Sequence, residues 1–238
     1  MTEHTYPGGE LDLFARAQRW KSYWITCVRS FIGGSVLEVG AGTGTNTLLL
    51  RNGGQRRWLC LEPDPKLTAV LTGKIAGFAN GSKPEVRTGT LTSLTPTELF
   101  DTILYIDVLE HIKDDREELQ LAAEHLNVGG HLVVLSPAHS WLFSQFDQAI
   151  GHFRRYTAKT LEALTPAKLR IVKSFYLDSA GLLASAANRF LLAQSLPTAR
   201  QIHCWDTFMI PCSRILDPLI ANRLGKSVVC VWTRPGVN

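Results

Sequence analysis

The sequence predicts an α/β fold in which helices cover both faces of a mostly parallel β-sheet. Short apolar segments typical of buried strands alternate with helical segments along most of the chain. A turn with glycines at alternate positions, Gly40, Gly42 and Gly44, follows the first of these strands and leads into a helix. The 238 residues and the hydrophobic content of 45% suffice for one such domain with added elements.

The elements follow one another in a regular order. An amphipathic helix over residues 10–32 ends at Gly33 and Gly34, and we treat residues 1–34 as an N-terminal helical lid that precedes a main domain over residues 35–238. Strands are predicted at residues 35–39, 57–61, 85–87, 102–106 and 131–135, with helices over residues 45–52, 66–78 and 115–126; the last helix is expected to stop at Asn127 and the pair Gly129 and Gly130.

The pattern changes after Pro137. An aromatic and charged segment runs from Trp141 to Tyr156, and it is followed by a helix over residues 158–164 and a strand over residues 170–177. A long apolar helix is predicted over residues 180–196, then an irregular stretch, a short helix and a last strand over residues 227–233.

Charge and hydropathy exclude several classes of function. The net charge of +4 comes from scattered basic residues, so no basic patch indicates nucleic acid. The apolar stretch 180–196 is interrupted by Asn188 and Arg189 and is too short to span a membrane, although contact with a lipid surface stays open.

The cysteines indicate a reducing compartment. There are five, none forms a C-x-x-C pair, and the odd count fits the cytoplasm, where we expect them as buried thiols. His203, Cys204 and Cys212 match no common zinc spacing, so no metal site is predicted.

The glycine turn and the acid after the second strand indicate a nucleoside ligand. Glycine has no Cβ, so the turn can adopt positive φ and let a ligand approach the backbone. The dinucleotide fingerprint G-x-G-x-x-G needs a third glycine where this chain has Thr45, which speaks against a nicotinamide-dependent oxidoreductase. Glu62 can accept hydrogen bonds from both hydroxyls of a ribose, whereas Asp64, just before Pro65, suits a helix cap.

Two motifs together resemble the class I S-adenosylmethionine-dependent methyltransferases of the small-molecule type. Residues 36–44, VLEVGAGTG, match the glycine-rich first motif of that family at every position, and residues 107–111, DVLEH, match the signature after its fourth strand. The resemblance implies a Rossmann-like, doubly wound sheet of seven strands with an antiparallel last strand, and an acceptor-side helical insertion built from residues 137–160 and 178–226. It also implies S-adenosylmethionine as cofactor and S-adenosylhomocysteine as product.

The same resemblance implies the cofactor contacts. The glycine backbone would lie along the methionine and ribose, Glu38 would support the ammonium group, and Asp107 would hold the methionine end beside an apolar wall at Val108. The chain departs from the family after the third strand, where the usual acid is missing and Thr90 or the backbone of Leu91 would meet the adenine. The residues predicted to bind the cofactor are therefore Glu38, Gly40, Gly42, Gly44, Glu62, Thr90, Leu91, Asp107 and Val108.

The predicted catalytic residues lie on the acceptor side. Residues 147–156, DQAIGHFRRY, resemble the D-x-x-x-G-H-x-R-R-Y segment of a subset of these methyltransferases, and His152 or Tyr156 could handle a proton there. His111 would lie near the transferred methyl, as a base or as packing for the cofactor loop. The arginines either bind an anionic substrate or pair with Asp147 or Glu110 and hold the loop.

The sequence therefore predicts an enzyme of small-molecule biosynthesis that transfers a methyl group to a small, largely apolar acceptor, with oxygen favoured as the methylated atom. An acceptor carried on a prenyl chain or other lipid is an alternative, which the apolar stretch 180–196 would suit. A nicotinamide-dependent oxidoreductase and a non-catalytic nucleoside-binding module are alternatives from other classes.

Overall fold

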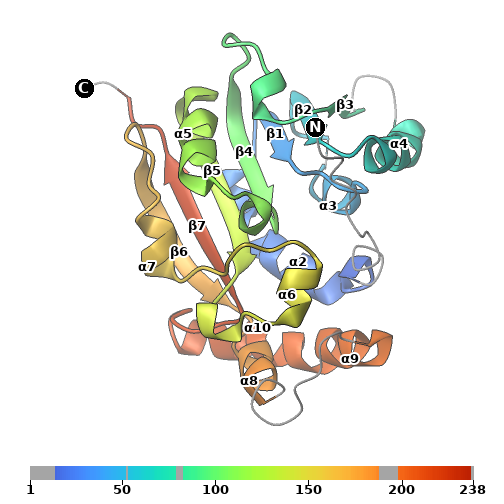
Figure 1. The fold of residues 1–238 in the computed structure, drawn as a ribbon, viewed down its shortest axis with the longest axis vertical. Coiled ribbons are helices and arrows are strands. Elements are labelled where there is room, and N and C mark those ends of the chain that lie inside the picture. Colours follow the sequence, from blue (N-terminus) through green and yellow to red (C-terminus); the bar gives the residue numbers. More distant parts are fainter. Residues whose placement is uncertain (1–13, 52, 79–82, 188–197, 237–238) are drawn as a thin grey trace.

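The computed structural model describes residues 14–51, 53–78, 83–187 and 198–236, and its centre is a seven-stranded sheet (Figure 1). The strand order is β3-β2-β1-β4-β5-β7-β6, with β7 antiparallel to both of its neighbours and every other pairing parallel. This confirms the predicted doubly wound sheet with an antiparallel last strand. The strands are β1 (Ser35–Val39), β2 (Arg57–Glu62), β3 (Glu85–Thr88), β4 (Phe100–Ile106), β5 (Leu126–Pro137), β6 (Arg170–Leu177) and β7 (Ser227–Thr233).

Helices cover both faces of the sheet. Apolar side chains of α2, α4 and α10 share one core cluster with the sheet, and those of α5 and α7 share the other. In Figure 1, α8, α9 and α10 lie at the end of the sheet toward which β4 points. The α-helices are α2 (Gln18–Val28), α3 (Thr45–Leu50), α4 (Pro65–Lys74), α5 (Asp115–Glu124), α6 (Gln145–Ala149), α7 (Ala158–Glu162), α8 (Ser179–Ala187), α9 (Ala199–Cys204) and α10 (Ile210–Leu219).

Shorter helical turns complete these elements. A π-helical segment, η7 (Trp205–Met209), joins α9 to α10. The 3-10 turns are η1 (Arg29–Phe31), η2 (Ile75–Gly77), η3 (Leu91–Ser93), η4 (Leu109–His111) and η5 (Ser140–Leu142). Both η1 and η2 directly continue a preceding α-helix, so the helices predicted over residues 10–32 and 66–78 end in tighter turns.

The largest departure from the predicted elements is at the start of β5. The helix predicted to reach residue 126 ends at Glu124, and the strand already begins at Leu126. Leu126 pairs with Phe100, and the register then shifts between Phe100 and Thr102. Gly129 and Gly130 therefore lie inside a strand rather than at a helix stop. The helix predicted over residues 180–196 begins as α8, and its portion at 188–196 lies outside the described residues.

The expectation that all cysteines are buried is wrong for two of them. Cys60 and Cys230 lie on central strands and are buried, and Cys27 is half-buried. Cys204 and Cys212 are exposed because α9 and α10 cover the end of the sheet and turn part of their surface to solvent. None of the helices in the described part of the chain has the length and apolar character to cross a membrane.

Buried carboxylates join the N-terminal helix to the elements after β6. The backbone N–H of Trp20 donates to Asp206 at 2.8 Å, and the hydroxyl of Tyr23 donates to Asp217 at 2.8 Å. Asp217 also accepts the N–H of Asp178 at 2.7 Å. These bonds fix α2 against η7 and α10 beside the carboxyl ends of the parallel strands, where open sheets of this class bind ligands.

Candidate functional site

The glycine turn packs directly against the loop that follows β4. Gly40 has φ of 64°, and a Cβ built on it would lie 2.7 Å from Cγ2 of Val108. Gly42 and Gly44 also have positive φ, of 55° and 76°, and Gly44 precedes α3 as its N-cap residue. Only glycine allows both this backbone conformation and this close approach. The two sequence motifs are therefore adjacent in space.

Glu62 connects the end of β2 to the same turn. Its Oε2 accepts the N–H of Gly42 at 2.8 Å, and its Oε1 accepts the N–H of Asp64 at 3.0 Å. Burial raises the pKa of Glu62, and the two N–H bonds act against that rise. Asp64 caps α4 by accepting the N–H of Lys66 at 2.7 Å, as its place before Pro65 predicted.

Glu38 is buried behind the turn, where its contacts are internal. Its Oε2 accepts the hydroxyl of Thr47 at 2.7 Å and Nε1 of Trp58 at 3.0 Å. Burial raises the pKa of Glu38 to about 7 despite these donors. The carboxyl thus links β1 to α3 and β2 beneath the glycine turn, and a contact with the cofactor ammonium group stays a prediction.

The loop after β3 lies beside Glu62. The N–H of Gly89 donates to the backbone carbonyl of Glu62 at 3.0 Å. Thr90 is exposed, and its hydroxyl lies 2.9 Å from that of Thr92, whereas the side chain of Leu91 is buried. The side chain of Thr90 is therefore accessible after β3, and its contact with the adenine stays a prediction.

Asp107 forms the part of the site after β4. It has φ of 55°, which is rare for a residue other than glycine and marks a constrained position. Its N–H donates to the carbonyl of Leu135 at 2.8 Å, and the residue as a whole is exposed. Desolvation by the surrounding protein raises the pKa of Asp107, while the charges of Lys21, His152 and Lys226 lower it. The charges of those three side chains therefore act on Asp107.

His152 is held by a buried carboxylate. Its Nδ1 lies 2.9 Å from Oδ1 of Asp147, which also receives Nε of Arg155 at 2.8 Å. Ser144 donates both its N–H and its hydroxyl to Oδ2 of Asp147. Despite burial, these bonds keep the pKa of Asp147 below its ordinary value. An ionised Asp147 makes Nδ1 of His152 the protonated nitrogen and leaves Nε2 to face the site.

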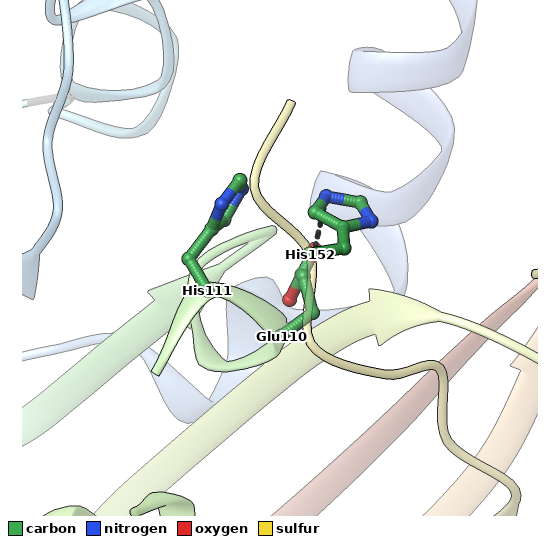
Figure 2. A group of neighbouring side chains, drawn as sticks. All are labelled: Glu110, His111 and His152. Carbon is green, nitrogen blue, oxygen red and sulfur yellow. Dashed lines mark ion pairs between the residues drawn. The ribbon is translucent and has the colours of Figure 1, made fainter. Parts of the chain in front are cut away.

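His111 and Glu110 complete a group with His152 (Figure 2). The rings of His111 and His152 lie 4.5 Å apart in an edge-to-face arrangement. Desolvation lowers the pKa of His111 to about 4, so this imidazole is neutral at physiological pH. Glu110 is fully buried, accepts the hydroxyl of Ser136 at 2.9 Å, and has Oε1 3.9 Å from Nε2 of His152.

Tyr156, predicted as catalytic, lies outside this group. It is buried, and its hydroxyl donates to Oδ2 of Asp115 at 2.7 Å. Burial and this acceptor raise the pKa of Tyr156 far above its ordinary value. Arg154 pairs with the same Asp115 at 2.7 Å. Both arginines thus form ion pairs within the protein, as expected if they hold the loop. Arg155 pairs with Asp147, as predicted, whereas Arg154 pairs with Asp115, which the sequence did not indicate.

The structure thus brings together five of the nine residues predicted to bind the cofactor. Gly40, Gly42, Glu62, Asp107 and Val108 surround the carboxyl ends of β1, β2 and β4. Sequence reasoning missed Lys21 and Lys226, because neither belongs to a local motif and only the fold places them near Asp107. A surface cavity of about 400 Å³ between Arg16 and α9 contains none of the predicted site residues.

Comparison with known proteins identifies the class of this chain. The family model described as "Methyltransferase domain" matches residues 14–173. No curated protein matched in the corresponding sequence search.

Solved structures share the fold at low sequence identity. An S-adenosylmethionine-dependent methyltransferase from Clostridium acetobutylicum superposes with a TM-score of 0.58 at 12% identity, covering 92% of both chains. Coclaurine N-methyltransferase bound to N-methylheliamine and SAH gives 0.61 at 14% identity, over 91% of this chain and 72% of the other. The [4+2]-cyclase SpnF gives 0.60 at 17% identity, over 92% and 82%. At these identities the likeness establishes the fold alone, on which other chemistry also occurs.

Proposed function

The chain belongs to the methyltransferase-domain family, and from this premise we propose that it transfers the methyl group of S-adenosylmethionine to the oxygen of a small, largely apolar acceptor. The observation that carries the proposal is that the loop after β1 contacts the end of β2 and the loop after β4 at the carboxyl ends of these strands. Gly40 meets Val108, and Gly42 donates to Glu62, so the glycine turn lies between the acid of β2 and the loop of β4. This is the edge of a parallel sheet where a nucleoside cofactor binds.

Each strand end has its own part in cofactor binding. Glu62 accepts the ribose hydroxyls with the lone pairs left free by Gly42 and Asp64. Thr90 and the backbone of Leu91 meet the adenine, and Asp107 holds the methionine end beside Val108. Lys21 of α2 donates to Asn46 at 3.2 Å, and its charge lowers the pKa of Asp107, which supports a covering role for the N-terminal segment.

Methyl transfer from a sulfonium needs alignment more than acid–base chemistry. A bond forms between the acceptor oxygen and the methyl carbon while the carbon–sulfur bond breaks, and its electron pair stays on sulfur as S-adenosylhomocysteine leaves. A neutral hydroxyl must also lose its proton. We place the acceptor oxygen beside His152 and His111, the polar groups next to Asp107, with Tyr156 fixing the loop through Asp115.

Calorimetric titration with S-adenosylmethionine tests the cofactor site. We expect Glu62→Ala to weaken binding by about 1.5–3 kcal/mol, because a charge-assisted acceptor is lost. Asp64→Ala is the matched control: it removes the cap of α4 and lowers thermal stability but leaves the Glu62 carboxylate in place. Absence of binding to the unaltered protein would refute the proposed function, and equal affinities for the two variants would remove Glu62 from the site.

The second candidate is an acceptor carried on a lipid, and one observation favours it. The helices at the ligand-binding end of the sheet expose large apolar side chains, among them Phe208 at 65%, Ile215 at 68% and Leu219 at 76%. Their spacing places the three on one side of the helical segment.

Two alternatives from other classes predict different behaviour. A nicotinamide-dependent enzyme would bind NADH, and a non-catalytic module would bind S-adenosylmethionine without releasing S-adenosylhomocysteine. The cytoplasm remains the proposed location, because the five cysteines are free thiols.

A further inference from the structure

Three potential metal ligands converge beside Asp107. One ligand atom from each of Glu110, His111 and His152 lies within 4.8 Å of the other two, and Figure 2 shows the two imidazoles above the carboxyl group. The side chains come from η4 and from the loop after α6, so the fold rather than local sequence brings them together. Two imidazoles and one carboxylate are a common ligand set for divalent zinc and iron.

Glu110 provides an independent indication of a missing partner. Its side chain is fully buried, and Oε1 has no hydrogen-bond partner among the described residues. That oxygen points toward His152, whose Nε2 is 3.9 Å away, beyond hydrogen-bond distance. A buried carboxylate oxygen without a donor is costly, and a cation between these two atoms would remove that cost.

The outer contacts of both histidines are those of metal ligands. Asp147 binds Nδ1 of His152 at 2.9 Å, which leaves the lone pair of Nε2 directed at the group. A backbone hydrogen bond with Gly151 holds the ring of His111. Histidines that bind metals characteristically use their second nitrogen in this way, on a carboxylate or a backbone carbonyl.

We propose that Glu110, His111 and His152 bind a divalent transition-metal ion of the zinc type, whose remaining coordination position receives the acceptor oxygen. The second half of this inference rests on the proposed function, whereas the first half does not. Tetrahedral ligands at zinc bond lengths are about 3.3 Å apart. The gap of 3.9 Å between Oε1 and Nε2 is wider than this, so a bound ion would draw the two side chains together.

The ion would change how the acceptor is activated. A hydroxyl bound to a divalent cation loses its proton to solvent near neutral pH, as zinc-bound water does. The resulting alkoxide or phenolate oxygen forms the new bond to the methyl carbon, and the carbon–sulfur electron pair remains on sulfur. His152 then acts as a ligand, so no protein base is required.

Metal titration of the purified chain, after removal of ions with EDTA, tests the site. We expect calorimetry to find one Zn²⁺ per chain, and Co²⁺ to give a visible absorption band that Zn²⁺ displaces. Glu110→Gln and His111→Asn should each weaken Zn²⁺ binding by more than about 100-fold, which exceeds the effect of losing an outer-shell partner. Glu110→Gln preserves the shape of the side chain and keeps an oxygen that can accept the hydroxyl of Ser136. If one of the two variants fails to fold, Zn²⁺ binding by the other tests the site.

His203→Asn is the matched control. His203 is an exposed histidine of α9 next to the exposed Cys204, so it reports adventitious surface binding. If Glu110, His111 and His152 form the site, His203→Asn should still bind one Zn²⁺ per chain. No binding, or equal affinity in the unaltered chain and in the Glu110 and His111 variants, would overturn the inference. Calorimetry with S-adenosylmethionine on the same samples separates the proposals, because cofactor binding without metal binding overturns the metal site alone.

Discussion

Glu38 lies in the core with only 2% of its surface exposed, yet it belongs to the most recognisable motif of the chain. The family resemblance put Glu38 at the cofactor ammonium group, which stays a prediction, but no sequence pattern indicated the internal contacts of its carboxyl. Its neighbours Thr47 and Trp58 are donors supplied by α3 and β2, and only packing brings them to Oε2. The same holds for Tyr156, whose partner Asp115 is 41 residues away.

The buried carboxyl of Glu38 makes a specific contribution to the pH dependence of stability. Its pKa rises from an ordinary 4.5 to about 7 on folding, so the folded state binds more protons between these values. The stability that Glu38 contributes is complete below pH 4.5 and falls as the pH rises through 7. We expect the unfolding free energy of the unaltered chain, relative to Glu38→Gln, to fall by up to about 3 kcal/mol across this window.

Urea denaturation at a series of pH values measures this difference. Glu117→Gln serves as the control, because Glu117 is an exposed acid of α5 and should leave the profile parallel to that of the unaltered chain. A Glu38→Gln profile parallel to the unaltered one would show that the Glu38 carboxyl titrates alike in both states.

At the scale of elements, sequence patterns succeed where the local pattern of residues defines the strand. Strands at residues 35–39, 170–177 and 227–233 were predicted with their observed bounds, since each shows a recognisable apolar pattern between turn signals. The start of β5 was not predicted, because the register shift after Phe100 depends on pairing with β4 and leaves no local pattern in the sequence. The attachment of α2 to α10 through Asp217 joins residues 194 positions apart and has no local signature either.

Asp217 is the residue whose loss should most affect this attachment. It accepts the hydroxyl of Tyr23 and the N–H groups of Asp178 and Ser179, all of them buried bonds. Asp217→Ala leaves three buried donors unsatisfied, and we expect the unfolding free energy to fall by about 2–4 kcal/mol. Glu124→Ala, which breaks an exposed ion pair with Lys168, should change it by less than about 0.5 kcal/mol. Urea denaturation of both variants gives the comparison, and a small effect at Asp217 would contradict this account.

At the scale of the whole molecule, the apolar surface is concentrated where the ligand-binding end of the sheet is covered. Ile215 and Leu219 of α10 are largely exposed, and Phe208 lies just before them. This arrangement would let the protein approach an acceptor embedded in a bilayer while the cofactor stays at the strand ends. A free metabolite as acceptor would need no such contact.

Co-sedimentation with anionic phospholipid vesicles separates the two kinds of acceptor. If the acceptor is lipid-linked, the unaltered chain should pellet with the vesicles, and Ile215→Asp with Leu219→Asp should remain in the supernatant because two apolar anchors are lost. Val128→Asp is the control, since Val128 is 61% exposed near the start of β5, away from the strand ends that form the site. Equal supernatant fractions for all three proteins would favour a free metabolite.

The position of β7 has a consequence for how the chain is made. Among the described residues, the edge strand β6 pairs with β7 alone, and β7 also pairs with β5. During synthesis the ribosome releases β1 to β5 in time for them to pair with one another, but β6 emerges about 50 residues before β7. Throughout that interval the backbone groups of β6 that pair with β7 have no partner strand. Chaperone capture of nascent chains is therefore expected to concentrate between the release of β6 and that of β7.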